Sequence, residues 1–240
     1  MNIKENLLPD FATRTSSVDM LVFHCNAYDL ETFCGYMKQY KTSAHYYIDE
    51  KGEITRLVAE ENKAYHAGLG YWRGNTNIND RSIGIELQSK SLGQTPYPEA
   101  QIKSLIELSQ TLIEKYKIIG QNIIGHADIT PNKKPDPGLW FPWKYLAQNQ
   151  IGLYPQSLST PKETNIKKLL SEIGYNTEND DMVKASAYAF CRRYVPKFVK
   201  IDPDVMHLVD NVLPDSYDFM SDYGFLCVLN SVNETYKKSA

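Results

Sequence analysis

The sequence has no excess of positive charge and no long apolar run, and both absences restrict what the protein can do. The chain has 240 residues, with 26 basic and 29 acidic side chains and a formal net charge of -3. A nucleic-acid partner would require a basic surface that neutralises phosphates, so this class is excluded. No apolar run approaches the ~20 residues that a membrane-spanning helix needs. The stretch 1–6 also lacks the apolar core of a secretory signal, so we expect either a cytoplasmic protein or one from which a signal was removed.

Cysteine is scarce as well. The four residues, Cys25, Cys34, Cys191 and Cys227, show no CxxC spacing, which argues against a zinc thiolate site or a redox pair. We expect free, buried thiols that pack as small hydrophobic groups, although an even number would permit two disulfides. The chain also contains no HExxH, which disfavours a zinc peptidase acting on ordinary peptides.

The composition is that of a globular protein, and the sequence divides into two parts. Hydrophobic residues make up 42% of the chain and charged residues 23%, and the length allows one large domain plus a small module. Residues 156–164 (QSLSTPKET) are rich in Ser, Thr and Pro and predict a linker. We therefore expect a first domain over residues 1–155 and a small all-α domain over residues 165–240.

Three apolar stripes at helical spacing predict a three-helix second domain. His207 lies on the margin of the third stripe and is expected to be structural. A part of this size is near the lower limit for a core of its own, so it could instead be a helical cap that stabilises the first domain. The stripes are formed by Ile166, Leu169, Leu170 and Ile173, by Val183, Ala187, Phe190 and Tyr194, and by Val205, Leu208, Val209 and Val212.

In the first domain, short apolar runs alternate with helical patterns, which is typical of an α/β protein. Residues 1–17 are polar and read as a lead-in arm, and a buried strand follows at Met20 to Phe23. Residues 98–116 give the clearest helical periodicity. The remaining predictions are a helix at 31–41, a hairpin at 44–48 and 54–58, strands at 82–88 and 123–125, and a short helix within 140–146.

One stretch in the middle of the chain predicts a metal site. The run Ile123-Ile124-Gly125 leads to His126, and a loop then presents Asp136 between two prolines, which restrict its backbone. Histidine and aspartate suit zinc or a similar divalent ion. We expect His24, at the end of the first apolar strand, as a third ligand, although a histidine at a strand end is often only structural. Lys134 could neutralise charge that develops on a substrate oxygen.

The strand at 82–88 presents a candidate general base. Ile83, Ile85 and Leu87 alternate onto one face, so Glu86 lies on the other face, next to Gly84, which leaves room for a ligand to approach. This placement suits a proton acceptor beside a metal. Without the neighbouring metal candidates, a glutamate here would be read as a solvated side chain.

Candidate substrate-binding residues lie nearby in the sequence. The loop 68–80 is rich in Gly and Asn and holds Trp72 and Arg73. We expect Trp72 to face solvent and stack on a sugar or peptide, and Arg73 to hold a carboxylate, although Trp72 could simply fill a gap. His45, in the predicted hairpin, is either a half-buried polar residue or part of a pocket wall, and the same alternatives apply to His66.

Five sequence blocks in a fixed order resemble the zinc-dependent N-acetylmuramoyl-L-alanine amidases, the family of AmpD-like enzymes and peptidoglycan recognition proteins. The blocks lie within residues 18–155 and read VFHCNA, SAHYYIDEKG, AYHAG, SIGIEL and GHADITPNKKPDPG. More weakly, IKKLLSEIGYN and VKASAYAFCRRYVP resemble a three-helix peptidoglycan-binding domain. The resemblance implies a mixed central sheet flanked by helices, followed by that small helical domain.

The resemblance also implies a bacterial enzyme that binds a zinc ion with His24, His126 and Asp136. Such an enzyme would cleave the amide bond between N-acetylmuramic acid, or its anhydro form, and L-alanine. In such enzymes the residue matching Glu86 activates the attacking water, and Lys134 would stabilise the oxyanion. His45 and His66 would lie near the substrate without binding the metal. The partner would be peptidoglycan or a soluble muropeptide, in cell-wall degradation or muropeptide recycling.

Two questions stay open at this point. The chain could be a recognition protein that binds muropeptides without cutting them, although all the candidate metal and catalytic positions are present. The second domain favours the polymer in the cell envelope or periplasm, whereas the missing signal favours a cytoplasmic enzyme acting on anhydromuropeptides. The oligomeric state is not predicted.

Overall fold

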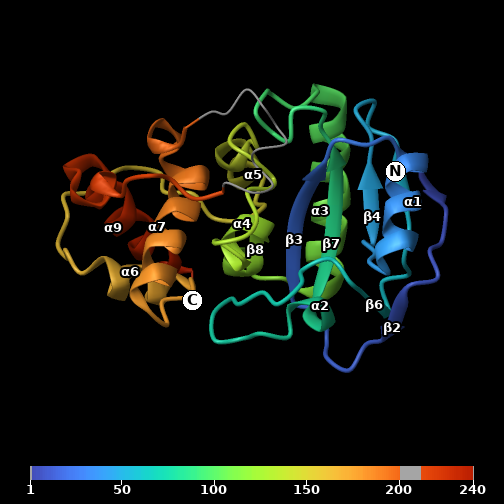
Figure 1. The fold of residues 1–240 in the computed structure, drawn as a ribbon, viewed down its shortest axis with the longest axis horizontal. Helices are drawn as coiled ribbons and strands as arrows, with labels where there is room; N and C mark the ends of the chain where they lie inside the picture. The colour runs from blue at the N-terminus through green and yellow to red at the C-terminus, as the bar shows by residue number, and fades with distance from the viewer. Residues whose placement is uncertain (1, 201–211, 240) are drawn as a thin grey trace.

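The protein is described by a computed structural model over residues 2–200 and 212–239, and its centre is a mixed sheet (Figure 1). The strands are β1 (Ile3–Glu5), β2 (Phe11–Thr13), β3 (Met20–Asn26), β4 (Tyr46–Ile48), β5 (Ile54–Arg56), β6 (Asn62–Ala64), β7 (Ser82–Gln88) and β8 (Ile123–Gly125). Six of them form one sheet in the order β1-β5-β4-β7-β3-β8, while β2 and β6 form a separate antiparallel pair. In the large sheet β4 and β5 are antiparallel, and the other neighbours are parallel.

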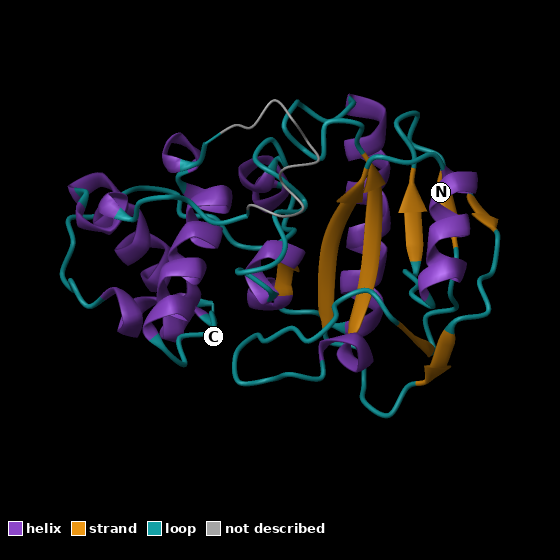
Figure 2. Cartoon of the chain, in the orientation of Figure 1, coloured by secondary structure: helices purple, strands orange, loops and turns teal. Residues whose placement is uncertain are grey.

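Helices cover both faces of this sheet (Figure 2). Helix α3 (Glu99–Tyr116) lies behind it, and α1 (Leu30–Tyr40) and α4 (His126–Ile129) lie in front (Figure 1). No helix among the described residues has the length and apolar character needed to span a membrane. The other helices are α2 (Ile78–Arg81), α5 (Trp143–Gln148), α6 (Ile166–Ile173), α7 (Asp180–Tyr194) and α9 (Tyr223–Lys238), with short 3-10 turns at Gly120–Asn122, Pro196–Phe198 and Asp218–Ser221.

Strand β3 is buried on both faces. Successive side chains point to opposite sides of the sheet, and a hydrophobic core covers each side. Leu21 and Phe23 point towards α3 and join a core that includes Leu105 of that helix. Met20 and Val22 belong to a second core on the other face. A strand buried in this way is a rigid base for the polar side chain that follows at its carboxyl end.

The second core is shared between the sheet and the C-terminal helices. Met20, Val22 and Ala127 lie in one cluster with Leu170 of α6 and Phe190 of α7. Residues 156–164 contain no helix or strand and are held along α9. For example, the Ser159 amide donates to Ser231 Oγ at 2.9 Å, and the Lys162 amide donates to Asn230 Oδ1 at 3.1 Å. The C-terminal helices therefore share a core with the sheet and lie beyond its β8 edge (Figure 1).

The α/β fold with a mixed central sheet is confirmed, as are the strand at 82–88 and the helix expected at 98–116, which begins at Glu99. The expectation of a bare lead-in arm is wrong, because residues 3–5 extend the sheet as β1 and residues 11–13 pair with β6. The stretch is polar because both strands are partly exposed. In the helical part, α6 and α7 match the first two stripes, and most of the third stripe and His207 lie outside the described residues.

The thiols are free, as predicted. Cys25, Cys34 and Cys191 are buried, and Cys227 is partly exposed. Cys25 joins the core facing α3, whereas His24 points to the opposite face of β3. Helix α9 was not anticipated, although its buried residues recur at helical spacing as Phe225, Leu229, Val232 and Tyr236.

Candidate metal centre

The candidate site lies where β3, β7 and β8 end at the same edge of the sheet. In the parallel register His24 of β3 is aligned with Glu86 of β7, so the two side chains leave the same face of adjacent strands. Strand β8 ends at Gly125, and α4 begins directly with His126. The loop after α4 then returns Asp136, whose carbonyl accepts a hydrogen bond from the Ala127 amide at 2.8 Å.

Three ligand atoms converge in a near-equilateral triangle. His24 Nδ1 lies 3.0 Å from His126 Nδ1, and each of these nitrogens lies 3.2 Å from Asp136 Oδ2. A tetrahedral zinc site with bonds of about 2.0 Å places its ligand atoms roughly 3.3 Å apart. Two imidazoles and one carboxylate are also the donor types that zinc prefers. Spacing and chemistry both fit a zinc ion with one further coordination position open.

The electrostatics of the triangle suit a cation. Burial and the neighbouring His126 lower the pKa of His24 to about 4, so this imidazole is neutral at neutral pH, as a metal ligand must be. Burial opposes ionisation of Asp136, but the adjacent His126 and His24 outweigh it and hold the pKa of this carboxyl well below its usual range. The site therefore offers an ionised carboxylate on Asp136 and a neutral imidazole on His24.

The return of the loop requires glycine at position 125. A Cβ added to Gly125 would lie 2.6 Å from the Cδ of Pro137, the residue after Asp136. The absence of a side chain thus lets the loop that carries Asp136 pack against the end of β8.

His66 contacts the first candidate ligand, His24. Its Nδ1 lies 2.9 Å from His24 Nε2, and its Nε2 lies 3.1 Å from Ser82 Oγ. A hydrogen bond to the remote ring nitrogen of a metal-binding histidine orients the ring and fixes the tautomer. His66 also lines the cavity that contains the triangle, so it is placed both to support His24 and to contact a bound molecule.

The ring of His66 occupies the space beside Gly84, so the expectation that a ligand could approach there is wrong. A Cβ at Gly84 would lie 2.5 Å from His66 Cγ. His45 is fully buried behind His66, with ring centroids 5.7 Å apart, and its Nδ1 accepts from the Gly84 amide at 3.0 Å. It does not line the cavity, so the prediction of His45 in the pocket wall is wrong.

Glu86 faces the cavity beside the triangle. It is half-buried, and burial, with a smaller contribution from the charge of Asp136, raises the pKa of Glu86 to about 8. Asn26 Nδ2 donates to Glu86 Oε2 at 3.0 Å. Asn26 was not among the predicted site residues, although it lies two residues after His24 in the same strand and therefore on the same face.

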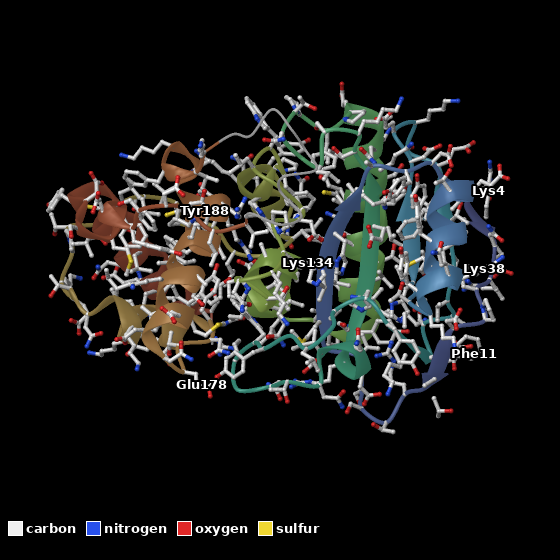
Figure 3. All side chains as sticks on the ribbon, in the orientation of Figure 1. Lys4, Phe11, Lys38, Lys134, Glu178 and Tyr188 are labelled. Atoms are coloured by element: carbon white, nitrogen blue, oxygen red, sulfur yellow. The ribbon has the colours of Figure 1, made fainter. Side chains whose placement is uncertain are left out.

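Lys134 lies in the loop between α4 and Asp136, on the front of the sheet (Figure 3). Its side chain is exposed and lines the same cavity, which has a volume of about 670 Å³. The Lys134 amide donates to the Thr130 carbonyl at 3.1 Å, which fixes the loop. The cavity thus brings together His24, His66, Glu86, His126, Lys134 and Asp136.

Trp72 and Arg73 do not reach this cavity. Trp72 is 1% exposed, donates from Nε1 to the Gln121 carbonyl at 2.9 Å and packs against Tyr175 at 5.0 Å between ring centroids. Arg73 donates from Nη1 to the Ile173 carbonyl at 3.1 Å. The prediction of a solvent-facing Trp72 is therefore wrong, because the loop docks on the C-terminal helices, whose position the sequence did not reveal.

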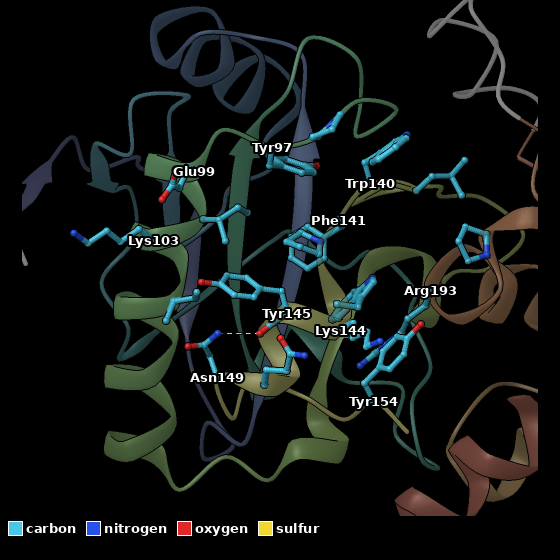
Figure 4. A pocket seen from close by; sticks show the side chains of 18 residues that line it. Tyr97, Glu99, Lys103, Trp140, Phe141, Lys144, Tyr145, Asn149, Tyr154 and Arg193 are labelled. Atoms are coloured by element: carbon cyan, nitrogen blue, oxygen red, sulfur yellow. Dashed lines mark hydrogen bonds between the residues drawn. The ribbon is translucent and has the colours of Figure 1, made fainter. Parts of the chain in front are cut away.

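A larger cavity of about 1280 Å³ lies on the face of the sheet covered by α3 (Figure 4). Its labelled side chains include Tyr97, Trp140, Tyr145 and Arg193. None of the clustered metal-binding candidates in the described part of the chain lines it. The smaller cavity on the front face is therefore the candidate active site.

Comparison with known proteins agrees with this site. A family model described as N-acetylmuramoyl-L-alanine amidase matches residues 14–139. The N-acetylmuramoyl-L-alanine amidase AmiD of Escherichia coli (strain K12) is 36% identical over 189 residues, 68% of each chain. The 1,6-anhydro-N-acetylmuramyl-L-alanine amidase AmpD of Enterobacter cloacae is 40% identical over 115 residues, 48% of this chain and 60% of the relative.

Solved structures extend the likeness beyond residues 14–139. The E. coli AmiD complex with anhydro-N-acetylmuramic acid-L-Ala-D-gamma-Glu-L-Lys has a TM-score of 0.74 at 29% identity and covers 93% of this chain and 92% of its own. AmpDh3 of Pseudomonas aeruginosa has a TM-score of 0.76 at 26% identity, covering 95% of this chain and 97% of its own. Such coverage includes most of the C-terminal helices. The family match and the AmiD relative together show that the chain belongs to the N-acetylmuramoyl-L-alanine amidase family.

Proposed function

We propose that the protein is a zinc-dependent hydrolase that cleaves the amide bond between the lactyl group of N-acetylmuramic acid, or its anhydro form, and L-alanine. The observation that carries this proposal is the triangle of His24, His126 and Asp136 with Glu86 beside it in one cavity. The names of the AmiD and AmpD relatives supply the bond. The residues by themselves indicate only metal-assisted hydrolysis of an amide.

His24, His126 and Asp136 would hold the zinc ion. Zinc in such a site acts as a Lewis acid and lowers the pKa of water to about 7. Three protein ligands leave a fourth position, which is the arrangement of catalytic rather than structural zinc sites. His66, on the remote nitrogen of His24, keeps that ligand ring in place.

Side chains of the protein would transfer the proton and stabilise the charge that develops on the substrate. Glu86 accepts a proton from the attacking water and delivers it to the leaving amine of L-alanine, and its half-buried position and raised pKa suit an acid and base that must exchange a proton near neutral pH. Asn26 orients the carboxylate of Glu86. The ammonium group of Lys134 stabilises the negative charge on the carbonyl oxygen in the tetrahedral state.

Product analysis by mass spectrometry tests the proposal. The protein is given intact murein sacculi and, separately, soluble anhydromuropeptide, each with and without a chelator. Peptides that begin with L-alanine and appear only without chelator are the expected result. No cleavage of either substrate by protein with zinc confirmed bound would contradict the enzyme and favour a recognition protein that binds muropeptides without cutting them.

The same experiment bears on where the protein acts and on the role of its C-terminal helices. We propose action in the bacterial envelope, where a peptidoglycan-binding helical part would hold the enzyme on its polymer, with the cytoplasm as the alternative. Preferred cleavage of sacculi supports the envelope. Preferred cleavage of soluble anhydromuropeptide supports recycling in the cytoplasm.

A further inference from the structure

The catalytic cavity has an aromatic wall that the proposed chemistry does not use. Tyr28 and Tyr36 line the cavity on the side of α1, and their ring centroids are 4.6 Å apart. The ring of Tyr40 continues the row, 6.3 Å from Tyr36 and nearly parallel to it at 15°. We name Tyr28, Tyr36 and Tyr40 the tyrosine row.

The two ends of the tyrosine row are exposed, and Tyr36 between them is half-buried. Tyr28 is 40% exposed and Tyr40 is 65% exposed. The buried side of α1 is supplied by other residues, Phe33 and Cys34, which pack on Tyr47. The rings of the row are therefore not needed for this core. Tyr28 and Tyr36 line the cavity, and Tyr40 stands next to Tyr36 outside the cavity lining, so the row leads outwards from the cavity.

Hydrogen bonds connect the backbone of Tyr28 to Asn26 and so to the proposed general base, Glu86. The Tyr28 amide donates to Asn26 Oδ1 at 3.0 Å, and Asn26 Nδ2 donates to Glu86 Oε2, also at 3.0 Å. Tyr47 Oη donates to the Tyr28 carbonyl at 2.7 Å. A single asparagine thus links the start of the row to the proposed general base, which gives the row a defined position relative to the bond that is cut.

The cavity has a different character on its other side. Figure 1 shows α1 on one side of β3 and β7, and α4 on the other. Lys133 and Lys134, in the loop after α4, are exposed and line the cavity there. Lys41 lines the α1 side as well. Lysines therefore occur on both sides of the cavity, whereas Tyr28 and Tyr36 of the tyrosine row line only the α1 side.

The proposed substrate is also divided into two parts. One side of the amide is a sugar, whose pyranose ring presents C–H groups that pack on the face of an aromatic side chain. The other side is a peptide, in which a γ-linked glutamate leaves a free carboxylate that suits a lysine. We propose that the tyrosine row is a subsite for sugar rings of the glycan strand, with the peptide on the side of Lys134. This inference rests on the proposed amidase function and makes a multi-sugar glycan its substrate.

The test compares two soluble substrates that carry the same peptide, one on N-acetylmuramic acid alone and one on an alternating N-acetylglucosamine and N-acetylmuramic acid tetrasaccharide. Tyr40→Ala is expected to raise the KM for the tetrasaccharide substrate roughly 3- to 10-fold, as the loss of one aromatic contact implies, with kcat unchanged. Tyr40→Ala should leave the KM for the single-sugar substrate unchanged. Tyr223→Ala is a matched control, because Tyr223 is 64% exposed and lies in α9.

Tyr40→Phe keeps the ring and should restore the wild-type KM, which separates loss of a stacking face from damage to α1. A KM that is unchanged for both substrates, or that rises equally for both, would overturn the subsite. So would a rise that depends on peptide length rather than on the number of sugars. Calorimetric binding of the peptide-free tetrasaccharide, weakened in Tyr40→Ala, tests the subsite without turnover, so its failure can be told apart from failure of the proposed amidase activity.

Discussion

Arg193 of α7 donates to Asp128 of α4 at 2.9 Å, and both side chains are buried. Asp128 Oδ2 also accepts from the Gly125 amide at 2.9 Å, and its Oδ1 accepts from Tyr175 Oη at 2.6 Å. Asp128 lies two residues after His126, in the same short helix. The C-terminal helices therefore hold the segment that carries a proposed metal ligand.

Removing this arginine should cost much of the protein's stability. Arg193→Met leaves the Asp128 carboxylate buried without its partner, which typically costs about 3 to 5 kcal/mol of unfolding free energy. The double variant Arg193→Met, Asp128→Asn should lose less than the sum of the single losses, because the unpaired charge is gone. Denaturant unfolding of the four proteins measures this coupling, and additive losses would contradict it.

Zinc should stabilise the protein through the triangle. At a free zinc concentration 100 times the dissociation constant, the native state gains about 2.7 kcal/mol, so the melting temperature rises. His24→Ala removes one ligand, and its melting temperature should respond little to zinc. Magnesium serves as the control, because it prefers octahedral oxygen ligands and should stabilise neither protein. An equal response of both proteins to zinc would place the metal elsewhere.

Glu86→Gln should separate catalysis from metal binding. The amide keeps the size of the side chain but cannot accept the proton from water, so kcat should fall by a factor of roughly 10² to 10⁴. Zinc content, measured on the purified variant, should match the wild type because Glu86 is not among the three clustered candidate ligands. Activity within about threefold of wild type would exclude Glu86 as the general base.

Gly84→Ala should weaken zinc binding without touching a ligand. The new methyl group would meet the ring of His66 at about the 2.5 Å found for an added Cβ, so His66 must move away from His24. Loss of such a supporting hydrogen bond typically lowers metal affinity about 10- to 100-fold. Gly35→Ala is the control, since an added Cβ there has no atom within 4 Å. Competition with a zinc indicator gives both affinities.

Asp80 should make stability depend on acid pH. It is buried, and although burial opposes its ionisation, hydrogen bonds from Thr15 lower the pKa of Asp80 to about 2. The native state therefore binds this proton less tightly than the unfolded chain, and the contribution is complete above pH 4 and falls as the pH drops towards 2. Asp80→Asn should lose roughly 1 to 2 kcal/mol at pH 6. Denaturant unfolding should show the difference from wild type shrinking as the pH falls from about 4 to about 2, and a constant difference would refute the assignment.

Periodic patterns within single segments of the sequence predicted several elements of the fold. The alternation of Ile83, Ile85 and Leu87 predicted which face of β7 presents Glu86, and helical spacing predicted α3. These elements were predictable because their periodicity follows from the geometry of one strand or one helix. Strand β1 was not, because three partly exposed residues at a sheet edge carry no such period.

The sequence also indicated which residues could form the metal site, because the types of His24, His126 and Asp136 and their places at strand ends are local properties. Only the tertiary structure decided how they meet, since His24 and His126 are 102 residues apart and their contact depends on the register of β3 with its neighbours. It likewise decided that His45 supports His66 from behind and that Trp72 is buried against the C-terminal helices. Burial and partner choice depend on packing between distant segments, which a pattern within one segment does not contain.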